Sequence, residues 1–216
     1  MDCKEIRTEA EVSGSRGYLL AKRLQDILLS GLALVALSPL LLLIAVLIVA
    51  DDPKGGPFFV QDRSGLNGRV FRMYKFRTMC VDAEERLKDV LQDNEMEGPV
   101  FKIRKDPRIT RIGGVLRRTS IDELPQLVNV LKGDMSLVGP RPLPTREVAV
   151  HTAYQKQRLL VTPGLTCFWQ VQPNRNDISF DNWVELDLRY IRERSWLLDW
   201  KLIFLTFGAL FRRDGR

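Results

Sequence analysis

An uncharged, strongly apolar run of 24 residues at positions 27–50 constrains the fold of this chain more than any other feature of its sequence. A helix rises about 1.5 Å per residue, so a helix of this length can cross a hydrocarbon core about 30 Å thick. Ser38 and Pro39 stand near the middle of the run. Proline removes one backbone hydrogen bond and clashes with the preceding turn, so we expect the helix to kink or break at this pair.

Basic residues flank the apolar run on both sides, which bears on its orientation in a membrane. Lysine and arginine favour the cytoplasmic side, so two basic flanks give a fully spanning helix no preferred orientation. A helix that enters the membrane, breaks at Ser38-Pro39 and returns to the same face satisfies both flanks. From the residues alone, a kinked spanning helix and this re-entrant helix are equal alternatives. The flanking residues are Arg16, Lys22 and Arg23 before the run and Lys54, Arg63 and Arg69 after it.

The charge of the chain is unevenly distributed. The net charge of +6 lies entirely in residues 51–216, because the charges of residues 1–26 cancel and residues 27–50 carry none. A basic domain beside a membrane segment suits anionic lipids or phosphate-bearing substrates, and nucleic acid is the competing partner. The single histidine and the three widely spaced cysteines argue against a histidine-based metal site, a Ser-His-Asp triad and a zinc site. Any catalysis would therefore depend on carboxylates and cations.

The segments after the apolar run predict an α+β fold dominated by helices. Two runs rich in Phe, Val and Tyr, at 57–65 and 68–79, predict a β-hairpin. An amphipathic pattern predicts a helix at 119–131, with Gly133 as its C-terminal cap. The scarcity of long alternating strands argues against a doubly wound sheet. Further helices are predicted at 146–160, 183–194 and 196–211.

The last predicted helix, at 196–211, is apolar and aromatic but carries Asp199 and Lys201. It is too short and too charged to span a membrane. Tryptophans beside basic residues suit a helix that lies in the membrane interface, and packing on the core of the domain is the alternative. The residues leave both open.

Two adjacent carboxylates, Asp122 and Glu123, follow Arg117 and Arg118 at the predicted start of a helix. The structural interpretation is a capping box, because Ser120 and Glu123 have the required spacing. The functional interpretation is a phosphate site, because a helix N-terminus binds phosphate oxygens and an ionised aspartate can attack phosphorus. A divalent ion held by the two carboxylates would reduce their repulsion from the phosphates.

Several cations near these carboxylates are held by their neighbours in the sequence. Lys75 and Arg77 flank Phe76 on the second strand of the predicted hairpin, and prolines on both sides hold Arg141 in a stiff turn. Bidentate arginine is well suited to binding phosphate. These cations are therefore candidate phosphate ligands.

The sequence resembles the bacterial sugar transferase family, the monotopic polyprenyl-phosphate phosphoglycosyl transferases. The resemblance extends from about residue 16 to residue 211. The motifs that carry it are Ser38-Pro39, PFFVQDRSG (57–65), YKFRTM (74–79), the run DPRITRIGGVLRRTSIDELPQLVNVLKGDMSLVGPRP (106–142) and TPGLT with QV (162–171).

The resemblance implies that the first helix is re-entrant and broken at Ser38-Pro39, so that both flanks face the cytoplasm at the bacterial inner membrane. It implies that Asp122 and Glu123 form the catalytic centre and work with Mg²⁺. Asp122 would attack the sugar-bearing phosphate of a UDP-sugar and release UMP. Polyprenyl phosphate, such as undecaprenyl phosphate, would then attack the covalent intermediate, with Glu123 a candidate base, and so initiate glycan assembly.

The resemblance also implies a division of the chain and a set of binding residues. The division is an N-terminal tail at 1–17, a re-entrant membrane helix at 18–52 and a cytoplasmic catalytic domain with interfacial helices at 53–216. The chain resembles the minimal form of the family. The residues expected to bind substrate are Lys75, Arg77, Arg118, Arg141, Arg175 and Asp187.

The chain departs from the family pattern in the loop expected to contact the nucleotide sugar. Cys167 follows Gly164-Leu165-Thr166 where the family commonly has glycine, and the loop before Arg175 is one residue longer. The identity of the sugar therefore stays open. The oligomeric state is open as well, and a homodimer is one option.

Two other functions compete with phosphoglycosyl transfer. One is a membrane-anchored basic scaffold or regulator without catalysis, whose basic tract at 102–118 binds anionic lipid or nucleic acid. Aromatic residues that would stack on bases are not interleaved with this tract, which argues against nucleic acid. The other is an ordinary glycosyltransferase, which would release UDP instead of UMP.

Overall fold

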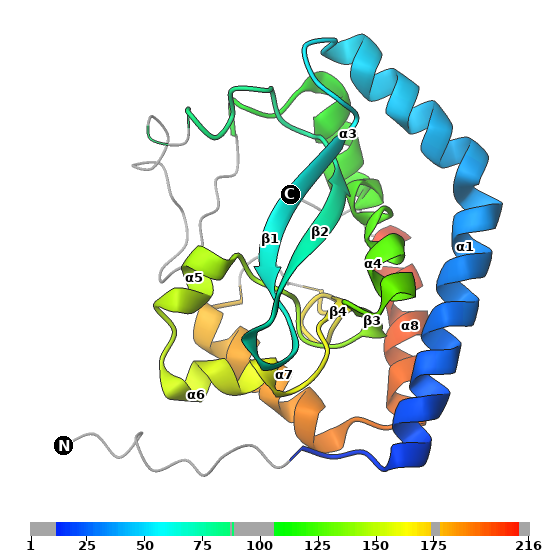
Figure 1. Cartoon of the computed structure of the whole chain (residues 1–216), viewed down its shortest axis with the longest axis vertical. Helices are drawn as coiled ribbons and strands as arrows, with labels where there is room; N and C mark the ends of the chain where they lie inside the picture. Colours follow the sequence, from blue (N-terminus) through cyan, green and yellow to red (C-terminus); the bar gives the residue numbers. More distant parts are fainter. Residues whose placement is uncertain (1–11, 87, 89–105, 174–177, 212–216) are drawn as a thin grey trace.

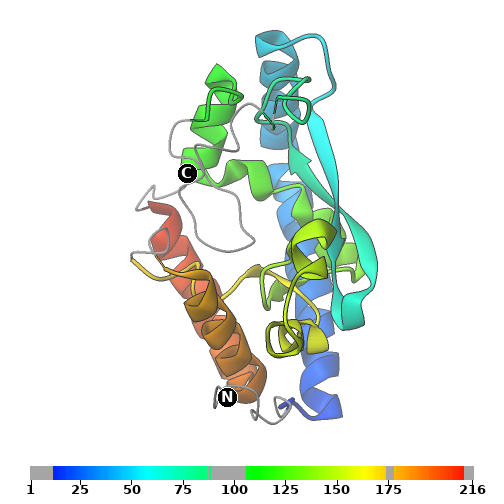
Figure 2. The same ribbon diagram turned by 90° about the vertical axis from the view of Figure 1, so that its left-hand side faces the viewer.

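The computed structural model describes residues 12–86, 88, 106–173 and 178–211. Helices dominate these residues, and two small two-stranded sheets accompany them, which confirms the predicted α+β class (Figure 1). Helix α1 (Arg16–Asp51) forms one flank of the domain. Figure 2 shows that it runs the length of the molecule.

The predicted break at Ser38-Pro39 is wrong as far as secondary structure is concerned. Helix α1 is a single helix of 36 residues that contains Pro39. Pro39 lacks the N–H that would bond the Val35 carbonyl. The Ser38 hydroxyl donates to that same carbonyl at 2.8 Å, so the carbonyl keeps a partner and the helix continues. The helix bends along its length but does not turn back on itself (Figure 1).

The two faces of α1 differ in character. Among the described residues, α1 is the one helix long and apolar enough, by length and composition, to cross a membrane. Leu28, Leu32 and Val35 are representative of the many exposed apolar side chains on its outer face. Its inner face touches the domain near both ends and is polar in the N-terminal half. The buried residues are Lys22, Gln25, Asp26, Ser30, Ile44 and Ile48.

Strands β1 (Phe58–Ser64) and β2 (Val70–Phe76) form the predicted antiparallel hairpin. Phe58 lies opposite Phe76, and Ser64 lies opposite Val70. The connecting turn η1 (Leu66–Gly68) contains Asn67 and Gly68 at positive φ, a conformation that these two residue types adopt readily. The hairpin prediction is confirmed.

Where one helix was predicted at 119–131, the structure has two short elements, the 3-10 turn η3 (Ile121–Glu123) and α4 (Gln126–Lys132). Helix α3 (Arg111–Thr119) precedes them and ends where the predicted helix was to begin. Pro125 directly precedes α4, where its missing N–H costs no helical hydrogen bond. Gly133 ends α4 at a φ of 92°, as predicted.

Strands β3 (Ser136–Val138) and β4 (Gly164–Thr166) pair in parallel. This pair was not predicted, because three-residue strands are too short to show alternation. A Cβ on Gly164 would lie 2.0 Å from the backbone nitrogen of Gly139, so only glycine allows the two segments to approach so closely. The pairing holds the turn at 139–142 against β4.

The predicted helix at 146–160 is divided into α5 (Thr145–Ala149), α6 (Ala153–Lys156) and the 3-10 turn η4 (Gln157–Leu160). Thr152 and Gln155 form a capping box, which starts a new helix at that point. The core lies between these elements and α7 (Phe180–Glu193), and it includes the stacked rings of Trp169 and Trp183.

Helix α8 (Trp196–Phe211) is formed as predicted. One side of it is buried in the domain through Asp199 and Leu202. The opposite side leaves Trp196, Leu197 and Phe204 exposed. Packing on the domain is therefore established, and an apolar surface is left for a membrane interface.

Candidate active site

The two adjacent carboxylates lie in a short turn between two helices. Ser120 takes a left-handed conformation, with a φ of 56°, and the turn η3 then carries Asp122 and Glu123. A capping serine needs an extended backbone for its hydroxyl to reach the following N–H groups. Ser120 makes no such bond, so the capping-box interpretation is wrong. Neither carboxylate is used to cap a helix through that motif.

Glu123 is held by two cations from different parts of the chain. Arg141 Nη1 donates to Glu123 Oε2 at 3.1 Å, and Arg141 Nη2 donates to Oε1. Lys75 Nζ also donates to Oε1, at 2.9 Å. The structure therefore brings together three of the predicted site residues, Glu123, Lys75 and Arg141.

The scaffold around these two cations is rigid. Lys75 lies on β2, opposite Phe59 of β1. The turn that carries Arg141 is held at its start, where Gly139 N donates to Thr166 O at 3.0 Å and Gly164 N donates to Pro140 O at 2.9 Å. Prolines on both sides restrict the backbone of Arg141 further. Both cations thus stand in place without a substrate.

Asp122 is the carboxylate without a partner. Its residue is 8% exposed, and within the described part of the chain its side chain accepts no hydrogen bond and forms no ion pair. Burial raises the pKa of Asp122, the charge of Lys75 opposes that rise, and the charge of Glu123 adds to it. Arg117, whose Nε donates to Thr78 Oγ1 at 2.9 Å, supplies a further positive charge toward Asp122.

The neighbouring carboxylate is shifted in the opposite direction. Burial would raise the pKa of Glu123, but Arg141 and Lys75 outweigh it and hold the pKa of Glu123 well below its usual range. A carboxylate with so low a pKa is a poor proton acceptor at neutral pH. This geometry argues against Glu123 as the general base. The dyad therefore consists of one restrained, ionised carboxylate and one unpaired carboxylate.

Arg77 and Asp187 lie elsewhere than the binding role predicted. Arg77 binds the end of α1, because its Nη1 donates to Asp52 Oδ2 at 2.7 Å. Asp187 is fully buried and pairs with Arg158, so its predicted contact with substrate stays a prediction. Arg118 is exposed on α3 near the dyad turn. Arg175 lies outside the described residues, so its predicted role stays a prediction.

Sequence reasoning assigned no role in the site to two arginines that contact the Arg141 turn. Arg63 Nη1 donates to the Pro142 carbonyl at 3.1 Å, and Arg158 Nη2 donates to the Arg141 carbonyl at 3.1 Å. The only available signal for Arg63 was its place in the motif at 57–65. No local pattern marks Arg158, because its partners are distant in the sequence.

The described residues fit a Mg²⁺ ion that is bound jointly with substrate, and they do not fit one that is bound by protein side chains alone. Within the described residues, no three His, Cys, Asp or Glu side chains form a metal cage. Mg²⁺ often binds through one or two carboxylates together with substrate phosphates and waters. Among the described residues nothing bonds to the oxygens of Asp122, so they are available for such a site. Glu123 already shares both of its oxygens with cations, so it fits less well.

Comparison with known proteins identifies a matching family and several relatives of this chain. The model of the family described as bacterial sugar transferase matches residues 17–213. Galactosyl transferase CpsE of Streptococcus agalactiae is 49% identical over 200 residues, which cover 92% of this chain and 44% of that protein. Undecaprenyl-phosphate galactose phosphotransferase of Salmonella typhimurium is 40% identical over 205 residues, which cover 93% of this chain and 42% of that protein.

Exopolysaccharide production protein ExoY of Sinorhizobium fredii is 40% identical over 200 residues, which cover 91% of this chain and 88% of that protein. The chain thus spans less than half the length of the two transferases above and most of the length of this relative. The family match includes α1, the dyad turn and α8. On these grounds, the chain belongs to the bacterial sugar transferase family.

Proposed function

We propose that this chain transfers a sugar 1-phosphate from a UDP-sugar to polyprenyl phosphate and releases UMP. The observation that carries the proposal is the asymmetry of the dyad. Asp122 is buried without a hydrogen-bond or ion-pair partner in the described chain, while Glu123 beside it is paired with Arg141 and Lys75. An unpaired carboxylate among cations is arranged to attack phosphorus.

The reaction follows in two steps. An oxygen of Asp122 attacks the sugar-bearing phosphorus, the bond from that phosphorus to the UMP oxygen breaks, and UMP leaves with the electron pair. An oxygen of polyprenyl phosphate then attacks the same phosphorus and expels the Asp122 carboxylate. Lys75, Arg141 and Arg117 supply positive charge near the phosphates, which is the main protein contribution to phosphoryl transfer.

In this proposal the role of Glu123 is to position two cations. Its two oxygens hold Arg141 and Lys75 beside Asp122 before a donor arrives, so the two side chains need little rearrangement when the donor binds. Mg²⁺, when bound through Asp122 and the donor phosphates, would supply further charge neutralisation. The names of two relatives support the two substrate classes, since one is an undecaprenyl-phosphate galactose phosphotransferase and another, of Erwinia amylovora, is a UDP-galactose-lipid carrier transferase.

We further propose a monotopic placement at the cytoplasmic face of the bacterial inner membrane. Near its N-terminal end, α1 is tied to the domain by Asp26, which accepts from Leu137 N at 3.0 Å. Near its C-terminal end, Asp51 accepts from Ile112 N at 3.0 Å, and Ile48 lies in a core cluster with Phe76. A helix tied at both ends to one domain keeps both ends on one side of the membrane.

Under this placement α1 is re-entrant through its bend and its shallow position, without a hairpin. The exposed apolar residues of α1 and the exposed aromatic side of α8 would both contact lipid. Labelling of cysteines introduced near residues 15 and 53 tests this. Modification of both from the cytoplasmic side is expected, and modification from opposite sides overturns the placement.

The nucleotide product tests the reaction. Protein in detergent or nanodiscs is incubated with a panel of UDP-sugars, undecaprenyl phosphate and Mg²⁺, and UMP and UDP are quantified. We expect UMP from at least one donor and none from Asp122→Asn. Release of UDP would support an ordinary glycosyltransferase, and intact-mass detection of a sugar phosphate on the protein without acceptor would support the covalent step.

A further inference from the structure

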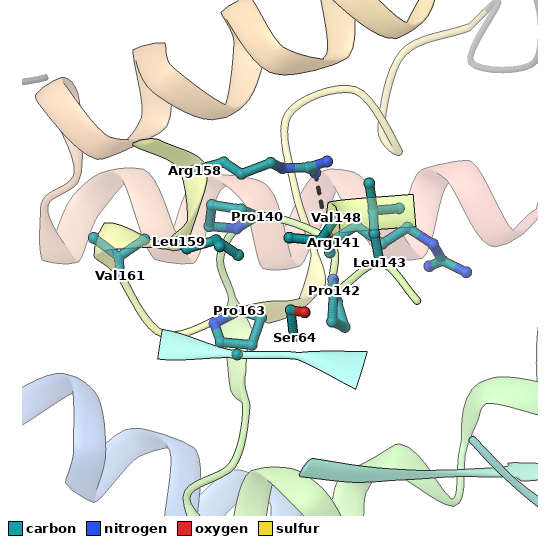
Figure 3. A pocket seen from close by; sticks show the side chains of 11 residues that line it. Ser64, Pro140, Arg141, Pro142, Leu143, Val148, Arg158, Leu159, Val161 and Pro163 are labelled. Atoms are coloured by element: carbon teal, nitrogen blue, oxygen red, sulfur yellow. Dashed lines mark hydrogen bonds between the residues drawn. The ribbon is translucent and has the colours of Figure 1, made fainter. Parts of the chain in front are cut away.

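We propose that Arg158 is a positioning residue that fixes the backbone of Arg141 and, through it, the fork on Glu123. The proposal rests on the proposed phosphoglycosyl transfer and adds a residue that touches neither carboxylate. Arg158 lies on η4, and its side chain is 2% exposed. Its Nη2 donates to the Arg141 carbonyl at 3.1 Å and to Asp187 Oδ2. Figure 3 shows the first of these bonds, with the Arg141 guanidinium pointing away from it.

The turn that Arg158 holds is the one that aims Arg141. Arg158 binds the Arg141 carbonyl and Arg63 binds the next carbonyl, that of Pro142. A cavity of about 10 Å³, enough for one water, lies among the side chains of this turn (Figure 3). Any displacement of the Arg141 backbone would be passed directly to its guanidinium.

Asp187 completes the arrangement from α7. It is fully buried, and its ion pair with Arg158 leaves that guanidinium few other orientations. Burying such a pair is costly, and well-packed apolar residues are often at least as stabilising. Apolar residues in place of the pair would therefore give the fold about the same stability. What apolar residues cannot supply is the N–H that holds the Arg141 carbonyl.

The contacts thus run from Asp187 to Arg158, to the Arg141 backbone, to the Arg141 guanidinium and to Glu123. A misplacement of about 1 Å at a reacting centre can lower a rate about 10²-fold. Loosening the Arg141 fork leaves the bond from Lys75 to Glu123 in place.

The test replaces the buried pair with apolar residues of similar size, Arg158→Met with Asp187→Leu. The matched control is Arg77→Met with Asp52→Leu, another ion pair with little exposure, in which the Arg77 side chain bonds, among the described residues, to Asp52 and Gly55 and to none of residues 136–143. Thermal unfolding is measured for both in the same detergent. Hydrogen–deuterium exchange is followed in the peptide that spans 136–143, and kcat and donor KM are measured from UMP release.

For the Arg158 pair we expect faster exchange at 136–143 and a fall in kcat of about 10²-fold. Donor KM should change less than kcat, because the fork is expected to act mainly on the transition state. The control should leave the exchange of this peptide unchanged. A purely structural role would lower thermal stability without changing the exchange of this peptide.

The proposal is overturned if the folded double variant keeps wild-type exchange at 136–143, whatever its activity. It is also overturned if kcat is unchanged. If the double variant does not fold, Asp187→Asn is measured instead, and an unchanged exchange rate and an unchanged kcat there overturn the proposal. Absence of UMP release by the wild-type protein counts against the proposed function only, because the exchange measurement does not depend on activity.

Discussion

Two buried clusters of charged and polar groups, each built around a carboxylate, have different consequences for this protein. The anchor cluster, composed of Tyr18, Lys22, Tyr190 and Asp199, joins α1, α7 and α8. The dyad cluster, composed of Lys75, Asp122, Glu123 and Arg141, lies where β2, η3 and the turn at 139–142 meet. In the anchor cluster Asp199 accepts from Lys22 Nζ at 2.8 Å, Tyr18 Oη at 2.9 Å and Tyr190 Oη at 2.7 Å.

The difference lies in what is left unbonded. Both oxygens of Asp199 have donors, so the anchor cluster has no capacity for a ligand. In the dyad cluster Glu123 is bonded in the same way, but among the described residues no donor bonds to Asp122 beside it. The carboxylate of Asp122 is therefore left available to a ligand. The fully bonded Asp199 therefore serves the stability of the fold, and the unbonded Asp122 is available for a reaction.

The largest expected effect comes from Asp122→Asn. Loss of the nucleophile should lower UMP release by about 10³-fold or more. Thermal stability should be unchanged or higher, because the variant removes a buried carboxylate that has no partner. UMP release and thermal unfolding of the same preparation test both parts. Substantial turnover by this variant would eliminate Asp122 as the nucleophile.

Arg141→Lys should have the next largest effect. Lysine keeps the charge but cannot reproduce the two parallel N–H bonds to Glu123. We expect a fall in kcat of about 10²-fold, with a smaller change in donor KM. Steady-state kinetics with varied UDP-sugar measure both constants. An unchanged kcat would show that the fork is not needed for the reaction.

Asp199→Asn probes the anchor cluster and should mainly affect stability. The variant leaves Lys22 buried without its counter-ion, which typically costs about 3 kcal/mol. UMP release per folded molecule should not change, because Asp199 does not contact the dyad. Thermal unfolding and activity below the transition separate the two effects. Loss of activity in a fully folded sample would contradict this division.

The smallest expected effect is a pH dependence at Glu123. Its pKa is held below that of an unfolded glutamate by Arg141 and Lys75 against the opposing effect of burial. The stabilisation is therefore complete above about pH 4.3, the ordinary pKa of glutamate, and is lost as the pH falls toward the lower folded pKa. The gap in thermal midpoint between wild type and Glu123→Gln should narrow between pH 6 and pH 3. A constant gap would count against the ion pair.

Local patterns in the sequence predicted several elements correctly. The hairpin was predictable from its alternating residues and its Asn67-Gly68 turn, and α8 from its length and composition. The predicted helix at 119–131 was wrong in its first half, because the left-handed Ser120 has no sequence signal of its own. The break at Ser38-Pro39 was wrong because a serine hydroxyl replaced the missing donor.

The candidate site was predictable in part. Asp122, Glu123, Lys75 and Arg141 could be named from motifs, and three of them are in direct contact. The bonding of Arg77 and Asp187 was not predictable, because their partners Asp52 and Arg158 are set by how distant segments pack. Arg158 itself carried no signal for the same reason.

The sequence by itself determined that a long apolar helix adjoins a basic domain that carries an Asp-Glu pair. It did so because hydrophobicity, charge and short-range propensity are properties of neighbouring residues. Only the tertiary structure decided which carboxylate is paired and which is left without a partner. It also decided that α1 is tied to the domain at both ends. Pairing depends on the distance between side chains that lie tens of residues apart, and chain folding alone sets that distance.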